Sequence, residues 1–114
     1  MLTVYEKPAC STCRKLRELL DARAVAYRTV DYHREPFTAQ TLCALLAAAA
    51  ITPREALRTR GGIAEAHGIT ETQPADAELL ELMATNPDLL QRPIVATGDR
   101  AVLARPVERV LELL

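Results

Sequence analysis

The sequence predicts an α/β fold with a mixed four-stranded sheet, and the order of its hydrophobic patterns carries this prediction. Residues 2–32 read as strand, helix and strand, residues 36–90 read as helical, and the remaining residues read as two strands and a helix. A strand–helix–strand unit of this length favours parallel strands with a right-handed crossover. We therefore expect residues 1–114 to form one domain with a helical insertion at about 36–90.

The N-terminal unit rests on three hydrophobic patterns. Leu2–Tyr5 is a short apolar run, and Val25–Tyr32 alternates and contains β-branched and aromatic residues, so both are expected strands. Between them we expect a helix from Thr12 to about Arg23, because its apolar residues share one helical face. These apolar residues are Cys13, Leu16, Leu19 and Leu20.

The middle of the chain reads as several helices. We expect one over Thr38–Ala50 with Thr38 as its cap, and a short one that opens at Pro53 and is interrupted by Gly61-Gly62. A further helix over Asp76–Ala84 ends at Asn86-Pro87. This block has too little core to fold alone, so it is expected to be an insertion between the two terminal units.

The C-terminal unit returns to strands. Pro93–Thr97 and Ala101–Ala104 flank Gly98-Asp99-Arg100, which is a good hairpin turn. Pro106 is expected in the first turn of a closing helix. The apolar face of that helix is expected to contain Val107, Val110, Leu111 and Leu114.

Composition limits the classes of function. The net charge of −1 gives no reason to expect nucleic-acid or membrane binding. The longest apolar run, Leu42–Ile51, is too short to span a bilayer, and the first residues lack a signal-peptide pattern. A cytoplasmic location is therefore expected. In that compartment three cysteines do not suggest a framework of structural disulfides.

The most informative motif is Cys10-Ser-Thr-Cys13, which lies between the first strand and the first helix. A helix N-terminus favours the thiolate form, so Cys10 is expected to be reactive. Cys13 falls on the apolar helix face and is either a resolving thiol or a small buried hydrophobe. The two-residue gap favours the resolving role. A zinc site would need a second ligand pair, which the remaining cysteine and histidines do not supply at a recognisable spacing.

The third cysteine and the two histidines are not expected to take part in catalysis. Cys43 is expected to be an inert packed thiol, and His33 and His67 are expected on the surface.

Two arginines stand beside prolines, in Arg92-Pro93 and Arg105-Pro106. A guanidinium group can donate two hydrogen bonds at once to an oxyanion. Either arginine alone would be taken as a solvated surface residue, but two such positions in a chain with a helix-start thiol favour an oxyanion site.

Three segments carry a resemblance to the arsenate reductases of the glutathione/glutaredoxin-coupled type, whose relatives include Spx-type redox regulators. They are Pro8-Ala-Cys-Ser-Thr-Cys-Arg-Lys15, Asn86-Pro-Asp-Leu-Leu-Gln-Arg-Pro-Ile-Val95 and Ala104-Arg-Pro-Val-Glu-Arg-Val-Leu111. The resemblance covers essentially the whole chain. It implies a thioredoxin-like fold with a helical insertion.

The resemblance also implies roles for individual residues. Cys10 matches the nucleophile, Pro93 matches a cis proline beside it, and Arg92 and Arg105 match two of three oxyanion-binding arginines. The third maps best to Arg58, although Arg60 is an alternative in this short segment. The family commonly has His-Asn where this chain has Glu6-Lys7. Glu6 could oppose thiolate formation and Lys7 could offset it.

The activity implied is reduction of arsenate through Cys10, with no metal or bound organic cofactor. Cys10 is regenerated either by glutathione and glutaredoxin, with glutathione as co-substrate, or through a Cys10–Cys13 disulfide that thioredoxin reduces. A different class of function is an Spx-like regulator, in which that disulfide is a switch and RNA polymerase is the partner. A third is a family member with another thiol-linked role.

Overall fold

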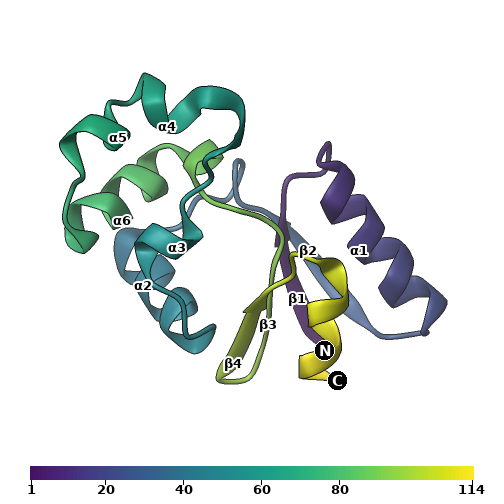
Figure 1. Cartoon of the computed structure of the whole chain (residues 1–114). Coiled ribbons are helices and arrows are strands. Elements are labelled where there is room, and N and C mark those ends of the chain that lie inside the picture. The colour runs from purple at the N-terminus through teal and green to yellow at the C-terminus, as the bar shows by residue number, and fades with distance from the viewer.

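Four strands form one mixed sheet in the computed structural model, which describes residues 1–114 (Figure 1). The strands are β1 (Leu2–Glu6), β2 (Tyr27–Asp31), β3 (Ile94–Thr97) and β4 (Arg100–Leu103). Their order in the sheet is β2-β1-β3-β4, in which β1 is parallel to β2 and antiparallel to β3, and β3 is antiparallel to β4. The predicted mixed four-stranded sheet is confirmed.

The strand boundaries differ from the prediction by one or two residues. β2 begins at Tyr27 rather than Val25, because the chain first turns through Ala24, which has a positive φ of 55°. The hairpin turn is Gly98-Asp99, and Arg100 already pairs with Thr97 in β4. Gly98 has a φ of 58°, a left-handed conformation that glycine adopts at little cost.

One face of the sheet is covered by α1 (Ser11–Ala22) and the closing helix η3 (Val107–Leu113). Their apolar side chains form a core of eight buried residues with the sheet. The core residues are Leu2, Val4, Leu16, Leu20, Val95, Val102, Ala104 and Val110. Leu16 and Leu20 lie on the predicted face of α1, so the 3.6-residue pattern of this helix identified its buried side correctly.

The opposite face is covered by the helical insertion between β2 and β3 (Figure 1). Its elements are α2 (Ala39–Ala48), α3 (Pro53–Ala56), η1 (Arg60–Gly62), α4 (Ile63–Ala66), α5 (Ile69–Thr72), α6 (Asp76–Thr85) and η2 (Pro87–Leu89). Thr38 caps α2 as predicted, accepting the N–H of Thr41 at 3.1 Å. Ile94 and Leu103 of the sheet belong to the same core as the insertion. No helix in the chain is both long and apolar enough to cross a membrane.

The helix that opens at Pro53 is short, as predicted, but it ends before Gly61-Gly62 is reached. It ends at Ala56, and Leu57 is extended and forms an isolated antiparallel bridge with Leu90. The flanking N–H of Arg58 donates to Leu89 O at 2.6 Å, and that of Gln91 donates to Ala56 O at 2.8 Å. The bridge buries two leucines and joins the middle of the insertion to the segment that leads into β3. This pairing overrides the local helical pattern.

The closing helix is a 3₁₀ helix, and the predicted apolar face was wrong in part. Leu114 is 55% exposed and Leu111 is also exposed, whereas Val107 and Leu113 pack around buried Val110. A 3₁₀ helix has three residues per turn, so residues three apart share a face. Pro106 precedes the helix with an extended ψ of 160° instead of occupying its first turn.

Candidate active site

Cys10 lies where the loop after β1 enters α1. It is the N-cap residue, with an extended backbone (φ −74°, ψ 126°), and its side chain is half-buried. Its N–H donates to Lys7 O at 2.9 Å, and its carbonyl accepts the Arg14 N–H at 3.0 Å. The thiol is therefore held at the positive end of a twelve-residue helix, as the sequence predicted.

The surroundings of Cys10 favour its thiolate. Partial burial alone would raise the pKa, but hydrogen bonding outweighs it: the backbone N–H and thiol of Cys13, the Arg92 guanidinium and the Thr12 N–H together lower the pKa of Cys10 to about 7. Hydrogen bonds to the charged form of a group stabilise that form. A large fraction of Cys10 is therefore a nucleophile at neutral pH.

Cys13 has the opposite character. It is fully buried on the inner face of α1, and burial raises its pKa to about 12, with the Cys10 thiol as a further cause. Because the thiolate is the attacking form, Cys13 is a poor nucleophile while Cys10 is a good one. Both readings of Cys13 therefore remain in the structure: it is a buried hydrophobe, and it lies beside the reactive thiol.

Arg92 is the most deeply buried cation in the chain. Its residue is only 6% exposed, and its Nε and Nη1 atoms are buried without a hydrogen-bond partner. Asp88 Oδ1 is the nearest carboxylate oxygen, at 3.5 Å from Nη1. A buried guanidinium with unused donors favours an anion that accepts from them. The peptide bond between Arg92 and Pro93 is cis, the geometry that the family resemblance implies.

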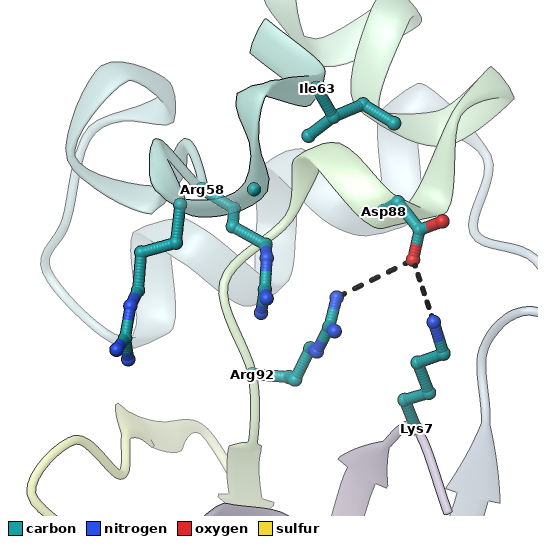
Figure 2. A pocket seen from close by; sticks show the side chains of 7 residues that line it. Lys7, Arg58, Ile63, Asp88 and Arg92 are labelled. Carbon is teal, nitrogen blue, oxygen red and sulfur yellow. Dashed lines mark hydrogen bonds and ion pairs between the residues drawn. The ribbon is translucent and has the colours of Figure 1, made fainter. Parts of the chain in front are cut away.

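Arg92 faces a pocket of about 200 Å³ between the insertion and the sheet (Figure 2). The pocket is lined by Lys7, Arg58, Arg60, Gly61, Ile63, Asp88 and Arg92. Four of these side chains are cations and one is a carboxylate, so the pocket carries a net positive charge. A small oxyanion is the ligand class that this charge and size favour.

The two alternatives for the third arginine occupy this pocket in different ways. Arg58 is half-buried, and its pKa is lowered by burial and by the neighbouring charge of Arg92. Arg60 is exposed. The Leu57–Leu90 bridge fixes the backbone of Arg58 next to the segment that carries Arg92. Arg58 is therefore the better placed of the two to share an anion with Arg92.

Arg105 does not line the same pocket. Its Nη1 donates to the carbonyl oxygen of Arg92 at 3.0 Å, and its side chain borders a second hollow beside the start of α1. Its charge still lowers the pKa of Arg58, so the three predicted arginines form one electrostatic group. The structure places Arg58 and Arg92 in one pocket and Arg105 next to the Arg92 backbone, outside the lining of that pocket.

Asp88 is the residue of this site that the sequence reasoning missed. Its Oδ1 atom accepts from Lys7 Nζ at 3.2 Å and hydrogen-bonds with His33 Nε2 at 2.9 Å (Figure 2 shows the link to Lys7). The hydrogen bond with His33 and the contact with Lys7 keep the pKa of Asp88 below its usual value. The signal was its position four residues before Arg92 in the quoted motif.

The predicted positions of the two histidines and of Cys43 are confirmed for only one of the three residues. His67 is exposed as predicted, but His33 is half-buried because its ring packs at a tilt against Tyr32 and hydrogen-bonds with Asp88. The prediction that Cys43 is packed was wrong, because Cys43 lies on the exposed face of α2. No group of three or more His, Cys, Asp or Glu side chains is arranged to hold a metal ion.

The Glu6-Lys7 pair does not direct either side chain at Cys10. Glu6 is only 4% exposed and its carboxylate forms an ion pair with Arg17. Lys7 contributes its carbonyl to the Cys10 N–H and turns its ammonium group to Asp88. The charge of the Glu6 carboxylate is thus balanced by Arg17, and Lys7 lines the cationic pocket.

Alkylation of Cys10 is expected to follow the lowered pKa. The rate with iodoacetamide should rise with pH, reach half its maximum near pH 7, and level off above that, because only the thiolate reacts. A Cys43→Ser background removes the signal of the exposed thiol. A midpoint at the usual free-thiol value of about 8.5 would contradict the proposed environment of Cys10.

Known proteins are similar to this chain in both sequence and fold. A profile of the ArsC family matches residues 5–113. Arsenate reductase ArsI2 of Synechocystis is 39% identical over all of this chain and 81% of its own length, and the arsenate reductase of Escherichia coli is 34% identical over 99% and 80%. The structure of an arsenate reductase from Vibrio cholerae superposes with a TM-score of 0.91 at 28% identity, covering 99% of this chain and 97% of that one. The thioredoxin-like α/β fold is thereby confirmed.

Proposed function

This chain belongs to the ArsC family, and from that premise we propose that it is a thiol-dependent arsenate reductase with Cys10 as its nucleophile. The observation that carries the proposal is that a thiol of pKa about 7 lies beside buried Arg92, whose Nε and Nη1 atoms have no hydrogen-bond partner. The thiol supplies the attack, and the arginine supplies binding for an oxyanion.

In the first step the arsenate oxygens are held by Arg58 and Arg92, and Arg105 supports Arg92 through the hydrogen bond to its carbonyl oxygen. The Cys10 thiolate attacks arsenic, a sulfur–arsenic bond forms, and an arsenic–oxygen bond breaks. The hydroxyl group leaves as water after taking a proton. The guanidinium groups stabilise the negative charge that collects on the remaining oxygens.

In the second step another thiolate attacks the sulfur of Cys10. A disulfide forms, the sulfur–arsenic bond breaks, and its electron pair stays on arsenic, which leaves as arsenite in the +3 state. The burial and high pKa of Cys13 support an external thiol in this step, with glutathione as the co-substrate. Glutaredoxin then returns Cys10 to the thiol. This chemistry needs no metal and suits the reducing conditions of the cytoplasm.

A coupled assay tests the proposal and identifies the donor. We expect arsenate-dependent oxidation of NADPH with glutathione, glutaredoxin and glutathione reductase, and little with thioredoxin and its reductase. Cys13→Ser should retain most of its turnover in the glutathione system, because Cys13 is not the second thiol. Loss of turnover in that variant would assign the second attack to Cys13, and no turnover by the wild type in either system would refute the reductase activity.

A further inference from the structure

Asp88 is the only carboxylate among the residues that line the cationic pocket. The other charged residues of its lining are Lys7, Arg58, Arg60 and Arg92, which are all cations. A carboxylate at an anion site costs binding energy, because its negative charge repels that of the ligand. The presence of Asp88 in this pocket is therefore not explained by the binding of negative charge alone.

Only one oxygen of the Asp88 carboxylate is used by the protein. Oδ1 accepts from Lys7 Nζ at 3.2 Å, hydrogen-bonds with His33 Nε2 at 2.9 Å and lies 3.5 Å from Arg92 Nη1. The links to Lys7 and Arg92 end on the same oxygen (Figure 2). Oδ2 takes part in no hydrogen bond or ion pair of the chain, and the Asp88 side chain is 44% exposed. The carboxylate therefore keeps accepting capacity for a ligand.

The backbone holds Asp88 in the wall of the pocket. Asp88 lies in η2, between Pro87 and the fully buried Leu89. The carbonyl oxygen of Leu89 accepts the N–H of Arg58, so the turn that carries Asp88 is tied to the segment that carries an arginine of the same pocket. The position of the carboxylate relative to the cations is thus fixed before a ligand arrives.

An ionised Asp88 distinguishes between ligand oxygens with and without a proton. The hydrogen bond with His33 and the contact with Lys7 keep the pKa of Asp88 below its usual value, so it is ionised at neutral pH. An ionised carboxylate accepts hydrogen bonds and donates none. It therefore binds a hydroxyl group of an oxyanion and repels an oxygen that carries only negative charge. A site that hydrogen-bonds a hydroxyl group rejects an analogue that lacks one.

We propose that Asp88 makes the cationic pocket selective for tetrahedral oxyanions that keep a proton at neutral pH, against those that keep none. Arg58 and Arg92 bind the charged oxygens, and Asp88 accepts a hydrogen bond from the hydroxyl group. Arsenate and phosphate keep a proton at neutral pH, whereas sulfate and selenate do not. The assignment rests on the proposed function, because it takes the cationic pocket as the arsenate site, but it can be measured without turnover.

The test compares the binding of inorganic phosphate with that of sulfate. Neither anion is reduced by a thiol, and at about pH 8 phosphate is largely a dianion with one proton whereas sulfate is a dianion with none. Titration of the backbone amide signals by NMR at constant ionic strength gives a Kd for each anion and shows whether Arg58 and Arg92 respond. The measured quantity is the Kd of sulfate divided by the Kd of phosphate. Because the two dianions have equal charge, a general change in pocket charge largely cancels in this ratio.

The wild type should bind phosphate at least about tenfold more tightly than sulfate, the value of one hydrogen bond to a charged group. Asp88→Asn keeps the shape of the side chain and removes its charge, so it should lower the ratio at least about fivefold. Asp88→Glu keeps a carboxylate and should retain more of the preference than Asp88→Asn. Asp99→Asn is the matched control, because it removes the same charge from an exposed turn outside the pocket and should leave the ratio unchanged.

A wild type that binds the two anions equally, or that binds phosphate without a response at Arg58 and Arg92, would overturn the assignment before any variant is made. Equal ratios in Asp88→Asn and Asp99→Asn would overturn it as well. The outcome is separate from that of the reductase assay. If the ratio behaves as expected but arsenate is not reduced, the selectivity stands and the reductase proposal fails. If arsenate is reduced but the ratio does not depend on Asp88, only the role of Asp88 fails.

Discussion

Cys10→Ser is expected to abolish arsenate-dependent NADPH oxidation in the coupled assay. A serine hydroxyl does not ionise near neutral pH and cannot form the disulfide that releases arsenite, so both steps stop. The remaining rate should equal that of the assay without protein. Residual turnover above that background would remove Cys10 as the nucleophile.

The same variant contains its own control for folding. Cys10 is the N-cap of α1 but its side chain makes no capping hydrogen bond, whereas serine is a favoured N-cap residue. Cys10→Ser should therefore unfold at the same temperature as the wild type or slightly above it. Loss of activity together with unchanged thermal unfolding would separate the chemistry of the sulfur from its structural role.

Arg92→Ala is expected to lower kcat/KM for arsenate by at least ~30-fold, equivalent to about 2 kcal/mol. Arg92 is only 6% exposed, its Nε and Nη1 atoms have no hydrogen-bond partner, and its guanidinium interacts with the Cys10 thiol. Its removal therefore takes a charge from the oxyanion and a hydrogen bond from the thiolate. The midpoint of Cys10 alkylation should move to higher pH in the same variant.

Two further variants show whether the effect belongs to the position of Arg92. Arg92→Lys keeps the charge but loses the planar fork, so it should recover the alkylation midpoint better than kcat/KM. Arg28→Ala removes an exposed arginine of β2, whose Nε donates to Thr3, and should leave both quantities unchanged. If the Arg92→Ala variant keeps the wild-type kcat/KM, Arg92 does not bind the oxyanion and has only a structural role.

The fold was predictable where local pattern and tertiary contacts agree. The 3.6-residue face of Leu16 and Leu20 in α1 is a local signal, and both side chains are buried on it. The strand pattern correctly predicted β2, although the burial of its residues does not alternate. The early end of α3 and the 3₁₀ form of the closing helix were not predictable. The first depends on pairing between Leu57 and Leu90, which are far apart in the chain, and the second on packing of the C-terminal residues against the sheet.

The sequence predicted which residues belong to the site, but it did not predict how their side chains are arranged. The helix-start position of Cys10 follows from the motif, and Arg92 follows from its place before Pro93. The sequence does not show that Arg105 turns toward a second hollow, or that Lys7, His33 and Asp88 meet. Those contacts join three segments that only the folded sheet and insertion bring together. Cys43 was misplaced because an alanine-rich helix gives little indication of which side is buried.

The Leu57–Leu90 bridge has a consequence for stability. It holds Arg58 of the insertion beside the segment that leads through Arg92 into β3, and both arginines line one pocket. An oxyanion that contacts both would act as a non-covalent cross-link between the insertion and the sheet. A ligand that binds only the folded chain raises the free energy of unfolding, by about 2.7 kcal/mol at a concentration one hundred times its Kd. Saturating arsenate is therefore expected to raise the unfolding temperature of the wild type, and to raise it less in a variant that lacks Arg58 or Arg92.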